Sequence, residues 1–131
     1  MSNQKPTLDE VLQSVSDVLF PEELGDEPVD LNSRSADDDT PLHVMAWRRD
    51  HRGARLLVEA GADVNAVGDM GETPLHVAVA QQDPEMVRLL LENGARDDVV
   101  SEFGKTTRQV AQSRGGPVWE AFANAMRRSK R

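Results

Sequence analysis

The feature that most constrains this chain is a segment that occurs twice, 33 residues apart. Residues 40–44 read TPLHV, and residues 73–77 read TPLHV again. A second pair keeps the same interval, since residues 56–59 read LLVE and residues 89–92 read LLLE. Self-similarity at one fixed period indicates stacked structural repeats, each of which buries its apolar face against its neighbours.

Each period contains the start signal of one helix and the stop signal of another. Thr40 and Thr73 suit the N-cap position, and the proline after each of them suits the first helical turn, where it loses no needed hydrogen-bond donor. The leucine-rich stretch later in the period supplies the apolar face of a second helix. Gly61 and Gly94 then end that helix in a left-handed conformation. Each period is therefore predicted to form a helix, a turn, a second helix and an extended loop.

These residues resemble the ankyrin repeat, which has this period and a T-P-L-H-x-A signature. The resemblance rests on residues 40–65 and 71–95, with weaker echoes at residues 30–32 and 104–111. It covers roughly residues 28–126. It implies an all-α solenoid of helix-turn-helix repeats joined by short hairpin loops.

The resemblance makes residues 1–131 a single ankyrin repeat domain. We expect a helical N-cap at residues 7–20, a first repeat at 37–69, a second repeat at 70–102, and a degenerate terminal repeat with a basic tail at 103–131. The N-cap helix begins with a capping box formed by Thr7 and Glu10. Apolar residues then recur at helical spacing up to Pro21 and give the helix one face that covers the first repeat. These apolar residues are Leu8, Val11, Leu12, Val15, Val18 and Leu19.

Two positions depart from the repeat pattern. Asp38 stands where Gly71 and Gly104 stand in the later repeats, and aspartate tolerates the required turn conformation less well, so we expect a distorted first hairpin. Gly53 stands where Met86 stands in the second repeat, at an apolar inner position. The second helix of the first repeat should therefore be the least stable, with either a cavity or a neighbour such as Met45 beside the glycine.

Composition limits the classes of function. The 131 residues include no cysteine, which excludes disulfides and thiolate metal sites. No long apolar run follows the N-terminus, so we expect neither a signal peptide nor a transmembrane helix, and a cytoplasmic location. The net charge of −8 is uneven, because residues 1–39 hold eleven acidic and two basic residues, whereas residues 117–131 carry a charge of +3. This pattern argues against nucleic acid and favours a basic protein as the partner.

The histidines are the only obvious candidates for catalysis. His43 and His76 occupy equivalent places, and the resemblance implies that they form hydrogen bonds within and between repeats near the threonine caps. His51 lies in a turn. No second histidine, aspartate or glutamate follows any of these histidines at the spacing of a metal site. No serine has the setting of a nucleophile. We therefore expect no catalytic residue, no metal, no cofactor and no enzymatic activity.

The resemblance also implies a partner-binding surface on the concave face, which is made by the hairpin tips and by the exposed side of each first helix. Three of its residues, Trp47, Met70 and Phe103, are large and apolar at positions that the fold does not need. Apolar anchors within an acidic rim are typical of an interface centre. The predicted partner-binding residues are Asp37, Asp39, Trp47, Arg48, Asp69, Met70, Glu72, Gln81, Glu102, Phe103, Lys105 and Arg114.

The predicted function is non-enzymatic binding of a protein partner that has a basic patch, by a monomer. One specific form of this hypothesis is an inhibitor or regulator of a basic enzyme. An alternative is a scaffold or assembly subunit that binds through the N-terminal helix or the C-terminal tail. A further alternative is an enzyme whose site has no recognisable motif.

Overall fold

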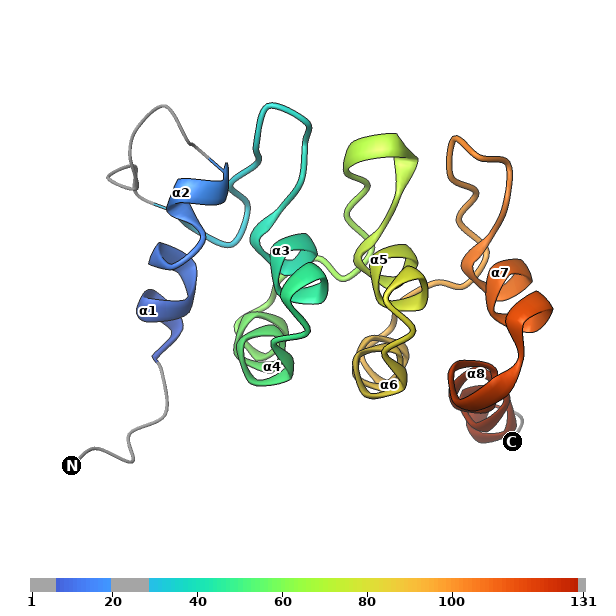
Figure 1. Cartoon of the computed structure of the whole chain (residues 1–131). Helices are drawn as coiled ribbons and strands as arrows, with labels where there is room; N and C mark the ends of the chain where they lie inside the picture. Colours follow the sequence, from blue (N-terminus) through green and yellow to red (C-terminus); the bar gives the residue numbers. More distant parts are fainter. Residues whose placement is uncertain (1–6, 20–28, 130–131) are drawn as a thin grey trace.

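The computed structural model describes residues 7–19 and 29–129, in which pairs of helices stand side by side in one row (Figure 1). Loops between the pairs rise from one side of the row, and this arrangement confirms the predicted all-α repeat fold. The elements are α1 (Leu8–Gln13), α2 (Ser16–Leu19), α3 (Pro41–Arg48), α4 (His51–Glu59), the 3₁₀ turn η2 (Asp69–Gly71), α5 (Pro74–Ala80), α6 (Pro84–Glu92), α7 (Thr107–Arg114) and α8 (Gly116–Ser129). Of the helices so described, none is long and apolar enough to cross a membrane.

The first helix of each pair begins at a threonine cap, as the sequence predicts. The threonine oxygen accepts a hydrogen bond from the backbone N–H three residues later, and the side chain at that later position accepts one from the threonine N–H. This reciprocal arrangement satisfies two backbone donors that a helix start leaves unpaired. The pairs are Thr40 with His43, Thr73 with His76, and Thr106 with Gln109. The terminal repeat therefore keeps the cap although it has lost the histidine.

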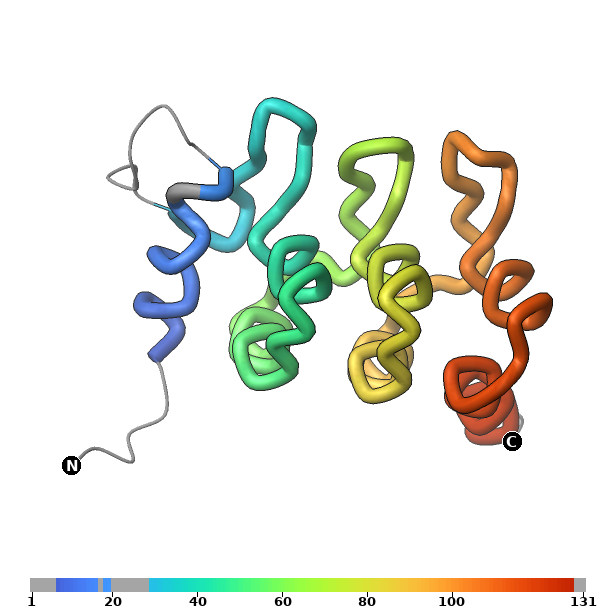
Figure 2. Tube along the Cα trace, in the orientation of Figure 1, coloured from blue at the N-terminus to red at the C-terminus, as the bar shows by residue number. Residues whose placement is uncertain are grey.

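Three loops are closed by equivalent backbone hydrogen bonds and form the row that we call fingers 1, 2 and 3, at residues 34–39, 67–72 and 100–105 (Figure 2). The N–H of Ser35 donates to the carbonyl of Asp39 over 2.9 Å, and the equivalent bonds close fingers 2 and 3. Asp38 has φ +70°, the same value as Gly71. The predicted distortion of the first hairpin is therefore wrong, because Asp38 adopts the left-handed conformation and keeps the turn bond from its N–H to Ser35.

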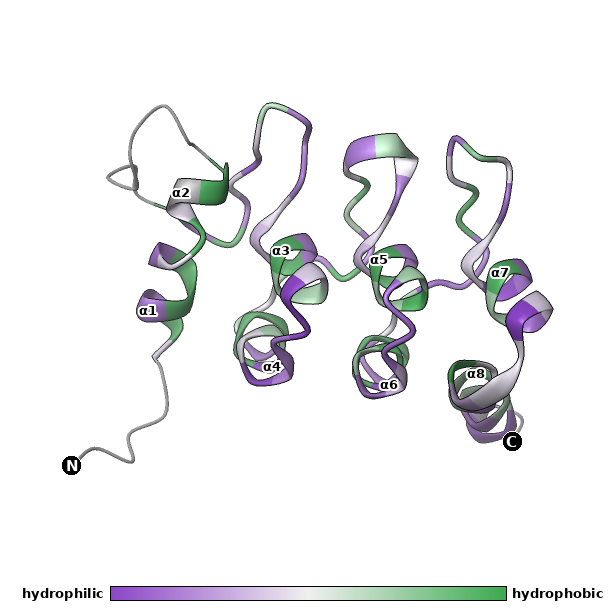
Figure 3. Ribbon diagram, viewed as in Figure 1, coloured by the Kyte–Doolittle hydropathy of each residue, from purple (hydrophilic) through white to green (hydrophobic). Residues whose placement is uncertain are grey.

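The core is continuous along the row, and the helices pack both within each pair and between successive pairs, with hydrophobic residues on one side of each helix (Figure 3). At Gly53, the sulfur of the buried Met45 lies 2.5 Å from the place that a β-carbon would occupy. The neighbouring methionine thus takes the space that a side chain at position 53 would need. This outcome matches the second of the two predicted alternatives.

The N-terminal helix is broken, so the prediction of one helix over residues 7–20 is wrong. The capping box of Thr7 and Glu10 is present, but α1 ends at Gln13 and α2 begins only at Ser16. The hydroxyl of Ser14 donates to the carbonyl of Val11 over 2.6 Å at the C-terminal end of α1. Pro21 lies outside the described residues.

The C-terminal helix α8 packs against α6 and closes the row. Phe122 is buried, and Trp119 stacks on it with ring centroids 6.3 Å apart. Arg127 and Arg128, which we predicted to lie in a basic tail, belong to the last turn of α8, and Arg128 forms an ion pair with Glu92 of α6. The residue limits that we drew for each repeat stay predictions.

Candidate functional site

Fingers 1 and 2 are tied together through two polar side chains of finger 1. The guanidinium of Arg34 donates to the carbonyl of Val67 over 2.8 Å and to that of Asp38 over 2.9 Å. The carboxylate of Asp39 accepts a hydrogen bond from the N–H of Asp69 over 3.1 Å. These bonds position the two fingers relative to each other, and the positive charge of Arg34 is directed at backbone carbonyls.

Finger 3 is held to finger 2 by backbone alone. The N–H of Glu102 donates to the carbonyl of Met70 over 2.9 Å. Met70 has φ +59°, a conformation that is unfavourable for its side chain, and the side chain is 47 % exposed. Phe103 at the tip of finger 3 is 69 % exposed. Both apolar side chains therefore face solvent from a backbone that is hydrogen-bonded in place.

Carboxylates gather where fingers 1 and 2 meet. Partial burial raises the pKa of Glu72, and the negative charges of Asp69 and Asp39 raise it further. Like charges that disfavour one another's ionised form create a place where an added cation is stabilising. This junction is therefore electrostatically suited to a lysine or arginine side chain of a partner.

A pocket of about 350 Å³ lies between α2, α3 and finger 1. Its apolar residues include Trp47 and Val18, which are 52 % and 48 % exposed. Sequence reasoning placed Val18 on the inner face of a single helix, and only the break before α2 shows that it lines this pocket. The full lining consists of Val18, Leu19, Ser35, Asp37, Asp39, Val44, Trp47 and Arg48. Four of the predicted partner-binding residues are thus brought together here.

Two predicted residues lie elsewhere, at the edge where the first and second helices of each pair connect. Gln81 accepts hydrogen bonds from the guanidinium of Arg49, through its side-chain oxygen over 3.3 Å and through its carbonyl over 2.5 Å. Arg114 lines a separate pocket of about 290 Å³ together with Gln82 and Pro84. The remaining predicted residues, among them Lys105, belong to the fingers.

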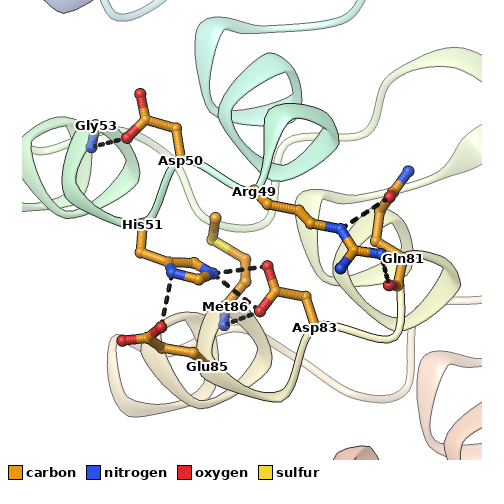
Figure 4. A network of polar contacts seen from close by, with 8 residues as sticks. All are labelled: Arg49, Asp50, His51, Gly53, Gln81, Asp83, Glu85 and Met86. Carbon is orange, nitrogen blue, oxygen red and sulfur yellow. Dashed lines mark hydrogen bonds and ion pairs between the residues drawn. The ribbon is translucent and has the colours of Figure 1, made fainter.

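His51 links the first and second repeats, a role that its sequence position did not reveal. Its Nε2 lies 2.7 Å from Oδ2 of Asp83, and its Nδ1 lies 2.7 Å from Oε2 of Glu85 (Figure 4). Asp83 is buried and also accepts a hydrogen bond from the N–H of Met86, so it caps α6 while it contacts the ring. The ring thereby fastens the start of α4 to the start of α6.

The two equivalent histidines are structural. Nδ1 of His43 accepts a hydrogen bond from the N–H of Thr40 over 3.1 Å, and Nε2 lies 2.9 Å from the carbonyl of Glu72 in the next repeat. His76 repeats the first of these contacts, but its buried Nε2 forms no hydrogen bond with another described residue. Burial lowers the pKa of both rings, and nearby carbonyls only partly oppose this effect. The lowered pKa favours the neutral form of both rings.

Within residues 7–19 and 29–129, no cluster of three or more histidine, aspartate or glutamate side chains has an arrangement that could hold a metal ion. A further pocket, of about 310 Å³, lies between α6 and α8 and is lined by Arg88, Arg127 and Arg128. Two of these arginines are already engaged, since Arg127 contacts Asn124 and Arg128 contacts Glu92.

Comparison with known families gives the class of protein. A family model described as ankyrin repeats (3 copies) matches residues 12–101, and the chain belongs to the ankyrin repeat family. A search of curated proteins returned no match. Ankyrin repeats are generally protein–protein interaction modules, and domains built from them are typically non-enzymatic.

Proposed function

We propose that this chain binds a protein partner that has a basic patch, and that it does so through the concave face formed by the fingers and the exposed sides of α3, α5 and α7. The observation that carries the proposal is the exposure of Trp47, Met70 and Phe103 among the carboxylates of this face. Large apolar side chains that are exposed within a charged rim are typical anchors of a protein interface.

The charge of the fingers supports a basic partner. Their acidic residues outnumber their two basic residues, Arg34 and Lys105, and Arg34 is occupied by backbone carbonyls. A field of one sign accelerates the approach of an oppositely charged partner and weakens as salt is added. The acidic residues are Asp37, Asp38, Asp39, Asp69, Glu72 and Glu102.

In its more specific form, the proposal makes this chain a stoichiometric inhibitor or regulator of a basic enzyme in the cytoplasm, with one copy of the chain bound to one partner. A rigid row of acidic fingers could cover the basic substrate-binding surface of such an enzyme. Affinity should then fall as salt rises, mainly through slower association. Binding that is indifferent to salt would contradict this charge-based form of the proposal.

The alternative of binding through the N-terminal helix has less support. Val11 and Leu12 of α1 are buried, and α1 packs against α4, so the apolar face of that helix is already covered. At the other end of the chain, Arg128 is engaged by Glu92. We therefore propose the concave face and not α1 or the C-terminal end of α8.

The test is affinity capture from lysate of the source cells with the wild-type chain and with a Trp47→Glu, Phe103→Glu double variant. We expect a partner to be retained by the wild type and lost by the double variant. The matched control is an Ala60→Glu, Asn124→Glu variant, which adds the same charge at two exposed positions, one just beyond α4 and one on α8. Retention of the same protein by all three chains would remove the concave face from consideration.

A further inference from the structure

We propose that the pocket between α2, α3 and finger 1 receives one large apolar side chain of the protein partner, and that a lysine or arginine beside that side chain pairs with Asp37 and Asp39. This inference rests on the proposed function, because it names the chemistry that the partner presents to one part of the concave face. The occupant is therefore a short basic segment with an aliphatic or aromatic anchor.

The pocket is lined by buried and by half-exposed apolar residues. Leu19 and Val44 are buried, whereas Val18 and Trp47 each leave about half of their surface in water. A volume of about 350 Å³ falls in the range of about 300 to 1,000 Å³ that is usual for binding pockets. An inserted apolar side chain would cover Val18 and Trp47, and removing that apolar surface from water is favourable.

The pocket arises from the break between α1 and α2. Val15, which precedes α2, and Leu19 of α2 are buried in the core, whereas the exposed Val18 of α2 lines the pocket together with Trp47 of α3. Neither Val18 nor Trp47 contributes a fully buried side chain to the core. Both are therefore available for a partner without any change in the packing of the first repeat.

The rim carries negative charge that the chain itself does not neutralise. The carboxylate of Asp37 forms no hydrogen bond or ion pair with another described residue. Arg48, which also lines the pocket, donates to the carbonyl of Ser14 over 3.4 Å, and Arg34 donates to carbonyls of the fingers, so neither forms an ion pair with Asp37. A cation from the partner is the complementary group for this rim.

The charge of the pocket rim favours a segment of a partner over the chain's own residues 20–28 as the group that binds there. Residues 20–28, which follow α2 in the sequence, contain four acidic residues and no basic residue. Their charge has the same sign as that of Asp37 and Asp39, and like charges disfavour one another at close range. The rim therefore favours a basic segment from another molecule.

Three pools of short synthetic peptides test the inference. The first contains a phenylalanine or leucine flanked by lysine and arginine, the second has the same anchor flanked by glutamate, and the third has serine in place of the anchor between basic residues. Binding is followed by the fluorescence of Trp47 in a Trp119→Phe variant, so that one tryptophan reports. We expect the first pool to bind, to change the emission, and to protect Trp47 from quenching by acrylamide.

Variants locate the binding. Val18→Glu should abolish binding of the first pool, whereas Ala60→Glu, which adds the same charge to an exposed residue beyond α4, should leave it unchanged. Asp37→Asn should weaken binding about two- to fivefold, as for the loss of one exposed ion pair. Glu59→Gln, which removes an exposed carboxylate at the end of α4, is its control. Each variant is first compared with the wild type by circular dichroism and thermal unfolding.

The inference is overturned if the first pool does not bind, if the second or third pool binds as tightly, or if Val18→Glu retains full affinity. These results are distinguishable from a failure of the proposed function. A captured protein that is lost by the Trp47→Glu, Phe103→Glu variant but kept by Val18→Glu would leave the concave face standing and remove this pocket. A captured protein that the double variant retains as well as the wild type does would contradict both the concave-face proposal and the pocket proposal.

Discussion

The sulfur of Met45 lies 2.5 Å from the position that a β-carbon on Gly53 would occupy. A contact this short requires the methionine to move, and the capping carboxylate of Asp50 lies 2.8 Å from the same position. The space around position 53, in the first turn of α4, therefore requires glycine, although glycine is among the weakest helix formers.

Gly53→Ala should lower the free energy of unfolding by about 1 to 3 kcal/mol, because overpacking outweighs the gain in helix propensity. Urea unfolding measures the effect. In a Met45→Ala background the same substitution should cost less, since the space beside position 53 is then free. A stabilised single variant would show that the methionine relocates without cost.

The contact between His51 and Asp83 predicts a stability effect across repeats. His51→Leu should destabilise the chain by about 1 to 2 kcal/mol, because the buried Asp83 loses one of its two polar partners. Thermal unfolding provides the measurement. Arg52→Gln, at the next and more exposed position of α4, is the control and should be nearly neutral. Equal stability of the two variants would mean that water replaces the ring at no cost.

Gln82→Gly should raise the free energy of unfolding by about 1 kcal/mol, because Gln82 has φ +53° and glycine adopts that conformation without strain. The terminal repeat supports this expectation, since Gly115 stands at the equivalent position with φ +66°. Ala80→Gly, within the nearby helix α5, should instead destabilise by about 1 kcal/mol. Chemical denaturation of both variants decides whether the turn conformation governs the effect.

The buried rings of His43 and His76 should make the stability of the fold depend on pH. Burial lowers the pKa of both rings below the ordinary value of 6.5, so the unfolded chain binds protons more readily than the folded chain. Stability should therefore fall as the pH drops from about 8 to about 5. His43→Gln, which imitates the cap of Thr106 and Gln109, should make the decrease shallower when unfolding is followed across this range. An unchanged slope would assign the effect to other groups.

Glu72 should change the pH dependence of folding stability in the opposite direction from the two histidines. Burial and the charges of Asp69 and Asp39 raise its pKa, so the folded chain binds this proton more readily than the unfolded chain, and the contribution of Glu72 to stability is lost as the pH rises above its raised pKa. Glu72→Gln should therefore stabilise the chain at neutral pH, and the difference should shrink as the pH falls through 4.5. Glu120→Gln on α8 is the control. If Glu72→Gln is less stable than the wild type at neutral pH, the ionised carboxylate of Glu72 stabilises the fold.

The repetition of TPLHV was enough to predict the family and the all-α repeat fold, because caps, stop signals and apolar stripes are local features that recur in register. The capping pairs at Thr40 and Thr73 followed from the same logic. The prediction of a continuous N-terminal helix was wrong because the apolar spacing continues without interruption through residues 14 and 15, where the structure has a turn. The undistorted turn at Asp38 also needed the structure, since aspartate tolerates the left-handed region to an extent that depends on its surroundings.

Only the tertiary structure decided which residues meet. The pairing of His51 with Asp83 joins residues 32 positions apart, and the pocket joins Val18 to Trp47 across the break in the N-terminal helix. Neither pair shares a local pattern that a sequence could display. The sequence by itself determined the repeating unit, because each unit is encoded by short-range preferences. The surface that the units present was decided by how they stack, because stacking alone sets which side chains from successive repeats lie side by side.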